Sequence, residues 1–492
     1  MQTIIVVDDP ADWPLALQDV ELVPARAYLT DPTYTDRKGA RVYNLCRSYR
    51  YQSLGYYVSL LAEARGHRPL PSVTTVQDLK SPTILRVFSD DLDAMIQKSL
   101  ARIQSKEFVL SIYFGRNVAK HYDRLCQHLF SLFQAPFLRS LFVHNEKTGK
   151  WTLASLGPIS ASEIPESHRP FVVEVAQEYF KGRRRAGGKR SRFRFDLAIL
   201  ADPQEEEPPS DERALQRFVK AAESVGLNVE FLRKEDFGRI AEFDALFLRE
   251  TTNVNHHTYR FARKAEAEGL VVVDDPESIL KCANKVFLAE LLERNRVLTP
   301  KTIIVHRGNR DAVAGRMGLP CILKQPDSSF SRGVVKVDAV QDLKGEVNRL
   351  LDRSELIIAQ EFLPTPFDWR VGIFDRQPLF ACRYFMARRH WQIYRRESNG
   401  AVADEGKYET LPVEHLPTPV LRTAMKAANL IGDGLYGVDL KEADGKVYVI
   451  EVNDNPNIDA GVEDQILKEE IYLRIMRVFL RRIEQRKAGI HP

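Results

Sequence analysis

Apolar and polar residues alternate along this chain with two periods, which distinguish strands from helices. Short runs rich in Val, Ile and Leu predict buried strands, and longer stretches with an apolar residue every three or four positions predict helices. In the first part of the chain, strands are expected at residues 4–7, 108–112 and 141–144, and helices at 56–64 and 118–133. This mixture is typical of an α/β domain.

After residue 194 the alternation becomes regular. Strands are expected at residues 194–200, 228–232, 245–248 and 271–273, and helices at 211–224 and in a segment that ends at 268. Strands that alternate with helices at this spacing predict a small parallel-sheet domain. From Pro276 a larger mixed α/β module follows, and its last helix is expected at about residues 463–485.

A basic, glycine-rich stretch at residues 181–192 separates the two parts. Glycines and charges of one sign bury little apolar surface, so this stretch predicts an exposed linker. The expected domains are residues 1–182, 195–275 and 276–486, with the linker at 183–194. A basic run is also compatible with binding RNA or an acidic tail, but no aromatic residues interleave the charges, so a solvated hinge is favoured.

A segment dense in tyrosine and arginine, residues 43–52, lies in the first domain. Guanidinium groups there are compatible with binding an acidic ligand. Tyrosine and arginine are equally enriched at interfaces between domains. The sequence leaves both interpretations open.

Composition narrows the class of protein. The chain has 492 residues, 44% apolar and 28% charged, which is typical of a folded globular protein. Its net charge of +4 does not by itself imply a nucleic-acid partner. It has no apolar run of the length of a membrane span, and its first residues lack the pattern of a secretory signal. Five cysteines without C-x-x-C spacing favour a reducing, cytoplasmic location over disulfides or a zinc site.

The strongest chemical pattern lies near the C-terminus. Asp439 interrupts one strand-like run, and Glu451 and Asn453 interrupt the next, with a turn at residues 443–446 between them. A hairpin would bring the three side chains together as a cluster of oxygen ligands, which suits magnesium that holds a nucleotide. An exposed hairpin with ordinary polar residues is the alternative. It is less favoured because unpaired carboxylates are costly in apolar strands.

Earlier segments supply groups suited to phosphate and adenine. Lys285 lies on an expected helix. Lys324 ends an expected strand, and a loop of small residues, 327–334, follows this strand. Such a loop offers backbone and hydroxyl donors to phosphate. An apolar strand at 356–363 runs into a hinge where Phe362 is placed to cover a ring, and Arg370 beyond it offers a forked donor. Plain strand ends are the alternative interpretation for each.

In this order, these segments resemble the ATP-grasp superfamily, specifically its RimK-like glutamate-ligase branch. The resemblance covers about residues 195–485 and includes the small domain, which is called pre-ATP-grasp in the family. The N-terminal region resembles, more loosely, the accessory domain found ahead of some RimK-like modules. The implied fold class is α/β, with an N-terminal α/β accessory domain, a pre-ATP-grasp domain with a small parallel sheet, and a two-lobed ATP-grasp module.

The resemblance also implies roles for individual residues, which are expectations at this point. ATP would be held by Lys285, Lys324 and Ser329 at its phosphates, by Glu361, Phe362 and Leu363 at adenine and by Asp368 at ribose. Asp439, Glu451 and Asn453 would bind Mg²⁺, with Mn²⁺ as a substitute. Arg370 and Arg383 would steady the acyl phosphate and the oxyanion, and Arg249, Arg388 and Asn457 would contact substrate.

The chain departs from the family pattern at three places. Its phosphate loop carries serines and only Gly333 where several glycines are usual. The family's Arg-Ser-Asn nucleotide contact has no clean match, and residues 388–394 stand near that position. Gly437 occupies the place where many relatives have an arginine two residues before the metal aspartate.

The implied activity is an ATP-dependent ligase that activates a carboxylate as an acyl phosphate and joins it to an amine. In the family the amine is usually an amino acid such as glutamate, and the acceptor is a peptide, a protein or a small acid; a homo-oligomer is compatible with the sequence. Two alternatives stay open: another ATP-grasp reaction, and a nucleotide-sensing or RNA-binding protein that does not ligate. The adjacent His256 and His257 are expected to be structural rather than metal ligands.

Overall fold

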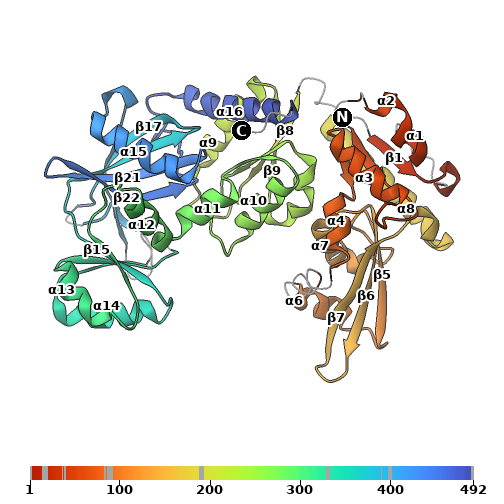
Figure 1. The fold of residues 1–492 in the computed structure, drawn as a ribbon, viewed down its shortest axis with the longest axis horizontal. Coiled ribbons are helices and arrows are strands. Elements are labelled where there is room, and N and C mark those ends of the chain that lie inside the picture. The colour runs from red at the N-terminus through yellow and green to blue at the C-terminus, as the bar shows by residue number, and fades with distance from the viewer. Residues whose placement is uncertain are drawn as a thin grey trace. The chain divides into compact units, whose positions relative to one another are not determined.

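The computed structural model describes residues 3–13, 20–35, 37, 40–81, 85, 92–187, 193–327, 333–388, 391–396 and 402–488. The chain forms two compact units (Figure 1). The first comprises Met1–Ser191 and Asp236–Arg239, and the second comprises Arg192–Glu235 and Ile240–Pro492. Among the described residues, no helix is both long and apolar enough to span a membrane.

The first unit contains two sheets. Four parallel strands run in the order β2-β1-β3-β4, and three antiparallel strands run in the order β5-β6-β7. The strands are β1 (Thr3–Val7), β2 (Glu21–Pro24), β3 (Arg41–Asn44), β4 (Arg68–Leu70), β5 (Glu107–Tyr113), β6 (Phe137–Asn145) and β7 (Lys150–Pro158). The helices are α1 (Ala25–Thr30), α2 (Pro32–Thr35), α3 (Leu54–Ala64), α4 (Val73–Asp78), α6 (Asp93–Leu100), α7 (Asp123–Leu132) and α8 (Arg169–Gly187).

The strands and helices expected in this unit are confirmed, but α7 is shorter than predicted. It begins at Asp123 because Lys120–Tyr122 forms a 3₁₀ turn ahead of it. Helix α8 continues to Gly187, into the stretch predicted as a linker, so the first part of that stretch is helical. Arginine and lysine are good helix formers, so a run of them can extend a helix. Residues 188–192 lie outside the described part of the chain.

The segment at residues 43–52 is largely part of the core of the first unit. Tyr43 is fully buried, and the Tyr49 hydroxyl donates to the carbonyl of Asn44 at 2.6 Å. The Asn44 amide in turn donates to the Gly55 carbonyl at 2.6 Å. Arg47, Arg50 and Tyr51 face solvent, and Tyr51 is 69% exposed. Burial explains most of these aromatic residues without a ligand.

The second unit begins with the expected parallel sheet, in the order β11-β10-β8-β9. Its elements are β8 (Phe195–Leu200), α9 (Glu212–Ser224), β9 (Leu227–Leu232), β10 (Ala245–Leu248), α10 (His257–Ala267) and β11 (Val271–Val273). The last helix, α16 (Glu469–Lys487), packs along α9 (Figure 1). It begins six residues later than position 463, where the sequence predicts its start.

Three further antiparallel sheets complete this unit. Their orders are β12-β15-β13-β14, β20-β17-β16-β21-β22 and β18-β19. The strands are β12 (Thr302–Val305), β13 (Cys321–Lys324), β14 (Val334–Val337), β15 (Ile357–Glu361), β16 (Phe367–Phe374), β17 (Gln377–Phe385), β18 (Tyr394–Arg396), β19 (Val402–Glu405), β20 (Tyr408–Leu411), β21 (Leu435–Ala443) and β22 (Lys446–Asp454). The helices are α11 (Pro276–Ala283), α12 (Lys285–Arg294), α13 (Val313–Met317), α14 (Val340–Leu351) and α15 (Thr418–Ile431).

The five-stranded sheet has one apolar face against α15. Side chains such as Trp369, Val438 and Leu440 pack there with α15 residues in one buried cluster. Because neighbouring residues of a strand point to opposite faces, residues adjacent to these lie on the other face. That other face forms the floor of the site described next.

Candidate functional site

The polar face of the five-stranded sheet gathers charged side chains from three strands. Asp439 of β21 lies opposite both Arg370 of β16 and Glu451 of β22. Residues opposite each other in a sheet share a face, and so do residues two apart on one strand. The shared face therefore presents Asp368, Arg370, Asp439, Lys441, Glu451 and Asn453.

A register shift on β22 brings Glu451 to this face. From the turn at residues 443–446 the strands pair regularly until Leu440 meets Val449, and the next pair is Asp439 with Glu451. Ile450 is therefore an extra residue on β22. Without it Asp439 would face Ile450, and Glu451 would point to the apolar side with Val438. The predicted hairpin is confirmed, but its carboxylates meet only because of this irregularity.

A cavity of about 280 Å³ lies over this face. It is also lined by the end of β15 and by two loops, one after β10 and one after β22. Predicted site residues in the lining are Lys285, Lys324, Glu361, Phe362, Leu363, Asp368, Arg370, Asp439, Glu451, Asn453 and Asn457. Ser329 lies outside the described residues. The structure thus brings together most of the residues that the sequence singled out.

Carboxylates on the floor are paired with cations. Arg370 donates to both oxygens of Asp439, from Nε at 2.7 Å and from Nη2 at 2.8 Å. Asn453 donates its amide to Asp439 Oδ2 at 3.0 Å. Lys441 Nζ lies 2.5 Å from Asp368 Oδ1. Forked and charge-assisted bonds of this kind fix the directions of the side chains.

Two buried lysines meet one glutamate. Lys285 Nζ lies 2.6 Å from Glu451 Oε1, and the side chains of Lys285 and Lys324 are almost fully buried. Burial lowers the pKa of Lys324 to about 8, although the charge of Glu451 opposes that shift. Burial acts to raise the pKa of Glu451, but the two lysines outweigh it and the pKa is lowered. Glu451 therefore stays ionised, and the lysines are held where an anion can bind.

The donor set fits the magnesium ion that the family resemblance implies. Asp439, Glu451 and Asn453 each carry a side-chain oxygen and share one face, which suits a hard cation. Among the described residues no three His, Cys, Asp or Glu side chains converge as a metal site, so the amide oxygen of Asn453 would be the third ligand. Each carboxylate is neutralised by Arg370 or Lys285, a role that a bound cation can take over.

The end of β15 supplies the apolar part of the lining. The Phe362 ring packs edge-on against Trp391, with centroids 6.1 Å apart, and Lys336 Nζ lies 4.7 Å from its centroid. The backbone N–H of Glu361 already donates to the carbonyl of Lys301 at 2.8 Å. A ring bound here would therefore meet the Phe362 face and other backbone groups, not the N–H of Glu361.

Arg383 does not reach the cavity. It pairs with Trp369 across β16 and β17, so it lies on the opposite face of the sheet from Arg370. Its guanidinium stacks over Trp369, 4.6 Å from the centroid, and its Nη1 lies 3.3 Å from Glu409. A register shift near Gly372 causes this placement: without it, Arg383 would lie opposite Asp368. The predicted contact of Arg383 with the acyl phosphate has no geometric basis.

Arg249 is not in the lining either. Its side chain is 1% exposed and donates to Asn455 Oδ1 at 2.7 Å, to Ser210 Oγ at 2.8 Å and to the Pro456 carbonyl at 3.1 Å. Burial lowers its pKa to about 10. A substrate carboxylate has no access to these donors, so the predicted substrate contact gives way to a role in holding the loop after β22. Arg388 is exposed and outside the lining as well.

Several lining residues escaped the sequence analysis. Lys441 was detectable, because it follows Asp439 by two positions on one strand and so shares its face. Thr252 and Asp454 gave no signal, since they lie 202 positions apart and meet only in the fold, where the Thr252 hydroxyl donates to Asp454 Oδ2 at 2.6 Å. Burial raises the pKa of Asp454 to about 7, against the lowering effect of that hydrogen bond.

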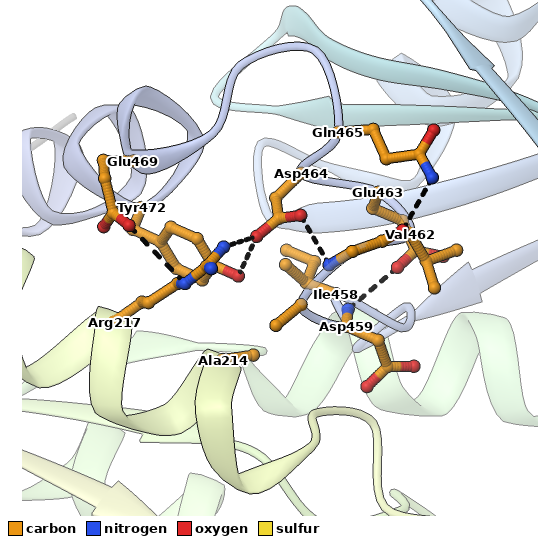
Figure 2. A network of polar contacts seen from close by, with 12 residues as sticks. Ala214, Arg217, Ile458, Asp459, Val462, Glu463, Asp464, Gln465, Glu469 and Tyr472 are labelled. Carbon is orange, nitrogen blue, oxygen red and sulfur yellow. Dashed lines mark hydrogen bonds and ion pairs between the residues drawn. The ribbon is translucent and has the colours of Figure 1, made fainter.

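Buried polar contacts fasten the loop between β22 and α16 (Figure 2). Asp464, at the centre, accepts hydrogen bonds from Arg217 of α9 and from the Tyr472 hydroxyl, the latter at 2.8 Å. Its other oxygen accepts from the Gly461 backbone at 2.7 Å. Glu463 Oε2 accepts from the Asp459 backbone at 2.8 Å. The loop that continues from Asn453 is therefore a rigid part of the site.

Known proteins are similar to this chain over parts of its length. Residues 25–175 match a family described as "RLAN: RimK-like ATPgrasp N-terminal domain". The chain is 26% identical over 199 residues to an alpha-aminoadipate–LysW ligase, LysX, of Saccharolobus solfataricus, covering 39% of this chain and 68% of that protein. It is 26% identical over 211 residues to a coenzyme gamma-F420-2:alpha-L-glutamate ligase of Methanococcus maripaludis, covering 40% of this chain and 68% of that protein.

A solved structure is similar in outline: the D-alanine–D-alanine ligase of Bacillus anthracis complexed with ATP. It has a TM-score of 0.46 and 14% identity over 59% of this chain and 99% of that chain. The expected glycine-poor phosphate loop falls largely on residues 328–332, outside the described part. The N-terminal match and the two relatives make the chain similar to RimK-like ATP-grasp ligases, and they support an ATP-dependent ligase that forms an amide bond.

Proposed function

We propose that the cavity binds ATP, Mg²⁺ and a carboxylate, and that an amino acid such as glutamate is joined to a peptide, protein or small-molecule acceptor. The carboxylate oxygen attacks the γ-phosphorus of ATP, the bond to the β-phosphate oxygen breaks, and ADP leaves. The amine nitrogen then attacks the acyl carbon, phosphate leaves, and the amine loses a proton as the amide forms.

One observation carries this proposal: paired carboxylates and cations share one cavity face. Lys285 and Lys324 are buried cations suited to phosphate oxygens once Glu451 turns to another partner. Arg370 offers a planar fork to an acyl phosphate or oxyanion. Magnesium, when bound to Asp439, Glu451 and Asn453, would neutralise the negative charge of the phosphates.

The remaining lining residues complete the roles. Phe362, with Glu361 and Leu363, covers adenine. Asp368 accepts from the ribose hydroxyls, and Lys441 at 2.5 Å fixes its direction. The names of the two ligase relatives support an amino acid as one substrate, since one joins alpha-aminoadipate to LysW and the other is a glutamate ligase.

The test is ADP and phosphate release by the full-length protein with ATP and Mg²⁺. A panel of amino acids, small carboxylic acids and peptides is offered in pairs, and products are identified by mass. We expect turnover with a specific pair and a product one condensation heavier, with a loss of at least about 100-fold in Glu451→Ala. The matched control is Glu409→Ala, an exposed glutamate outside the cavity lining. ATP binding without turnover for any pair would favour the nucleotide-sensing alternative.

A further inference from the structure

The two loops at the cavity contribute a second set of side chains with a different charge. We define the loop side of the cavity as Thr251, Thr252, Asn253, Asp454, Asn455 and Asn457. Its one ionisable group is Asp454. On the sheet floor, by contrast, each carboxylate has a cation: Lys441 for Asp368, Arg370 for Asp439 and Lys285 for Glu451.

Asp454 lacks such a partner. Among the residues that the structure describes, no lysine, arginine or histidine lies within ion-pair distance of its carboxylate. Its side-chain hydrogen bond comes from the Thr252 hydroxyl, at 2.6 Å. A half-buried carboxylate without a counter-charge is costly, so the group either holds a proton or pairs with a cationic ligand.

The surroundings disfavour a second anion beside Asp454. The charge of Asp275 acts on Asp454, and burial raises the pKa of Asp274 well above its ordinary value, so Asp274 holds its proton. Asp274 is fully buried, and its Oδ2 has no hydrogen-bond partner among the described residues. Arg249 lies behind the loop, but its guanidinium is committed to Asn455, Ser210 and backbone carbonyls. The loop side of the cavity therefore favours a cationic ligand over an anionic one.

The loop side is also rigid. Asn455 adopts a left-handed conformation, with φ of 47°, and both ends of its amide are bonded, to Arg249 at 2.7 Å and to the Glu250 carbonyl at 2.6 Å. Asp454 directly precedes Asn455, so the fixed backbone of Asn455 limits the position of Asp454. The hydrogen bond from Thr252 then orients the Asp454 carboxylate. A fixed carboxylate is suited to orient a ligand rather than only attract it.

We propose that Asp454, oriented by Thr252, binds the ammonium group of the amine substrate, the amino group of an amino acid, on the loop side of the cavity. This inference rests on the proposed function, because it assigns the amine of that reaction. Asp454 is a specificity-determining residue here: it selects a free primary amine and disfavours a blocked one.

The test is calorimetric titration of the full-length protein, saturated with Mg²⁺ and a non-hydrolysable ATP analogue, with each of the common L-amino acids and its N-acetyl derivative. We expect at least one amino acid to bind and its N-acetyl form to bind at least tenfold more weakly. Asp454→Asn should weaken that amino acid at least tenfold, and Thr252→Val should weaken it about threefold to tenfold.

The control variant is Asp444→Asn. Asp444 is exposed at the turn between β21 and β22, with φ of 51°, a conformation that asparagine also tolerates. It should bind amino acid as the unaltered protein does. Unchanged affinity for the ATP analogue in Asp454→Asn shows that the variant is folded. Equal binding of N-acetyl amino acids, unchanged binding by Asp454→Asn, or no binding of any amino acid would each overturn the proposal.

A second measurement separates this proposal from the proposed function. Hydroxylamine traps acyl phosphates as hydroxamates and carries no ammonium group at neutral pH. With an accepted carboxylate, Asp454→Asn should form hydroxamate at near the rate of the unaltered protein, while its KM for the amino acid rises at least tenfold. If hydroxamate never forms, the ligase mechanism fails, and the calorimetric result still decides the role of Asp454.

Discussion

The substitution Glu451→Gln tests whether one carboxylate compensates two buried ammonium groups. Lys285 Nζ lies 2.6 Å from Glu451, with side-chain exposures of 9% and 23%. Lys324 is 8% exposed and interacts with the same carboxylate. The variant keeps the shape of the side chain and removes its charge, so the two lysines are left facing each other.

The expected loss follows from this geometry. Removing one partner of a buried ion pair costs about 3–5 kcal/mol, because the other charge stays buried without compensation. Lys324, with a pKa of about 8, can release its proton and so limit the loss. We therefore expect about 3 kcal/mol, which lowers the Tm by roughly 5 °C for a unit of about 300 residues.

Differential scanning calorimetry of the full-length protein at pH 7 measures this change. Glu409→Gln is the matched control, because its pair with Arg383 is exposed at 33% and 54% and should be worth at most about 1 kcal/mol. Adding Lys285→Met to Glu451→Gln should restore part of the Tm. If Glu451→Gln melts no lower than Glu409→Gln, or Lys285→Met adds a further full loss, the reasoning is refuted.

Three further predictions follow from the same structure. Arg370→Met should lower kcat/KM at least about 100-fold. Arg383→Met, on the other face of the sheet, should change kcat/KM by no more than about threefold. Equal losses in steady-state assays would contradict the assignment of the two arginines to opposite faces. Burial raises the pKa of Glu463 from 4.5 to about 7, so the folded protein holds a proton that the unfolded chain has lost between these values. The contribution of Glu463 to stability should thus fall by up to about 3 kcal/mol as pH rises from 4.5 through 7, and Glu463→Gln should make the slope shallower in thermal melts from pH 5 to 8. Arg249→Met should cost about 2–4 kcal/mol of stability, because it removes the donor to Asn455 Oδ1 and to the Pro456 carbonyl, and a Tm equal to that of the exposed-site variant Arg213→Met would contradict this.

The alternation of residues predicted most elements of the fold. Strands β8 to β11 and helix α9 lie where the sequence predicts them, and α10 ends where it predicts, each within one residue. Strand and helix periods are local, so the chain carries them without reference to distant contacts. The hairpin with Asp439 and Glu451 was likewise predictable, because apolar strands, a turn and three polar side chains stand close together in sequence.

Pairing register decided which side chains share a face, and only the tertiary structure fixed it. One extra residue, Ile450, brings Glu451 beside Asp439, and a second shift in β16 and β17 turns Arg383 away from Arg370. A slip by one position reverses the face of every later residue, and no local pattern marks it.

Contacts across long sequence separations were also beyond the reach of the sequence. Arg249 was expected to meet substrate, but the fold buries it against Asn455, 206 positions away. Thr252 and Asp454, 202 positions apart, are likewise joined by a hydrogen bond that forms only in the folded chain. A sequence determines which groups are available and which local structures they favour. The packing of the loops after β10 and β22 decides which groups reach the cavity, because burial and hydrogen bonding depend on neighbours that only the folded chain brings together.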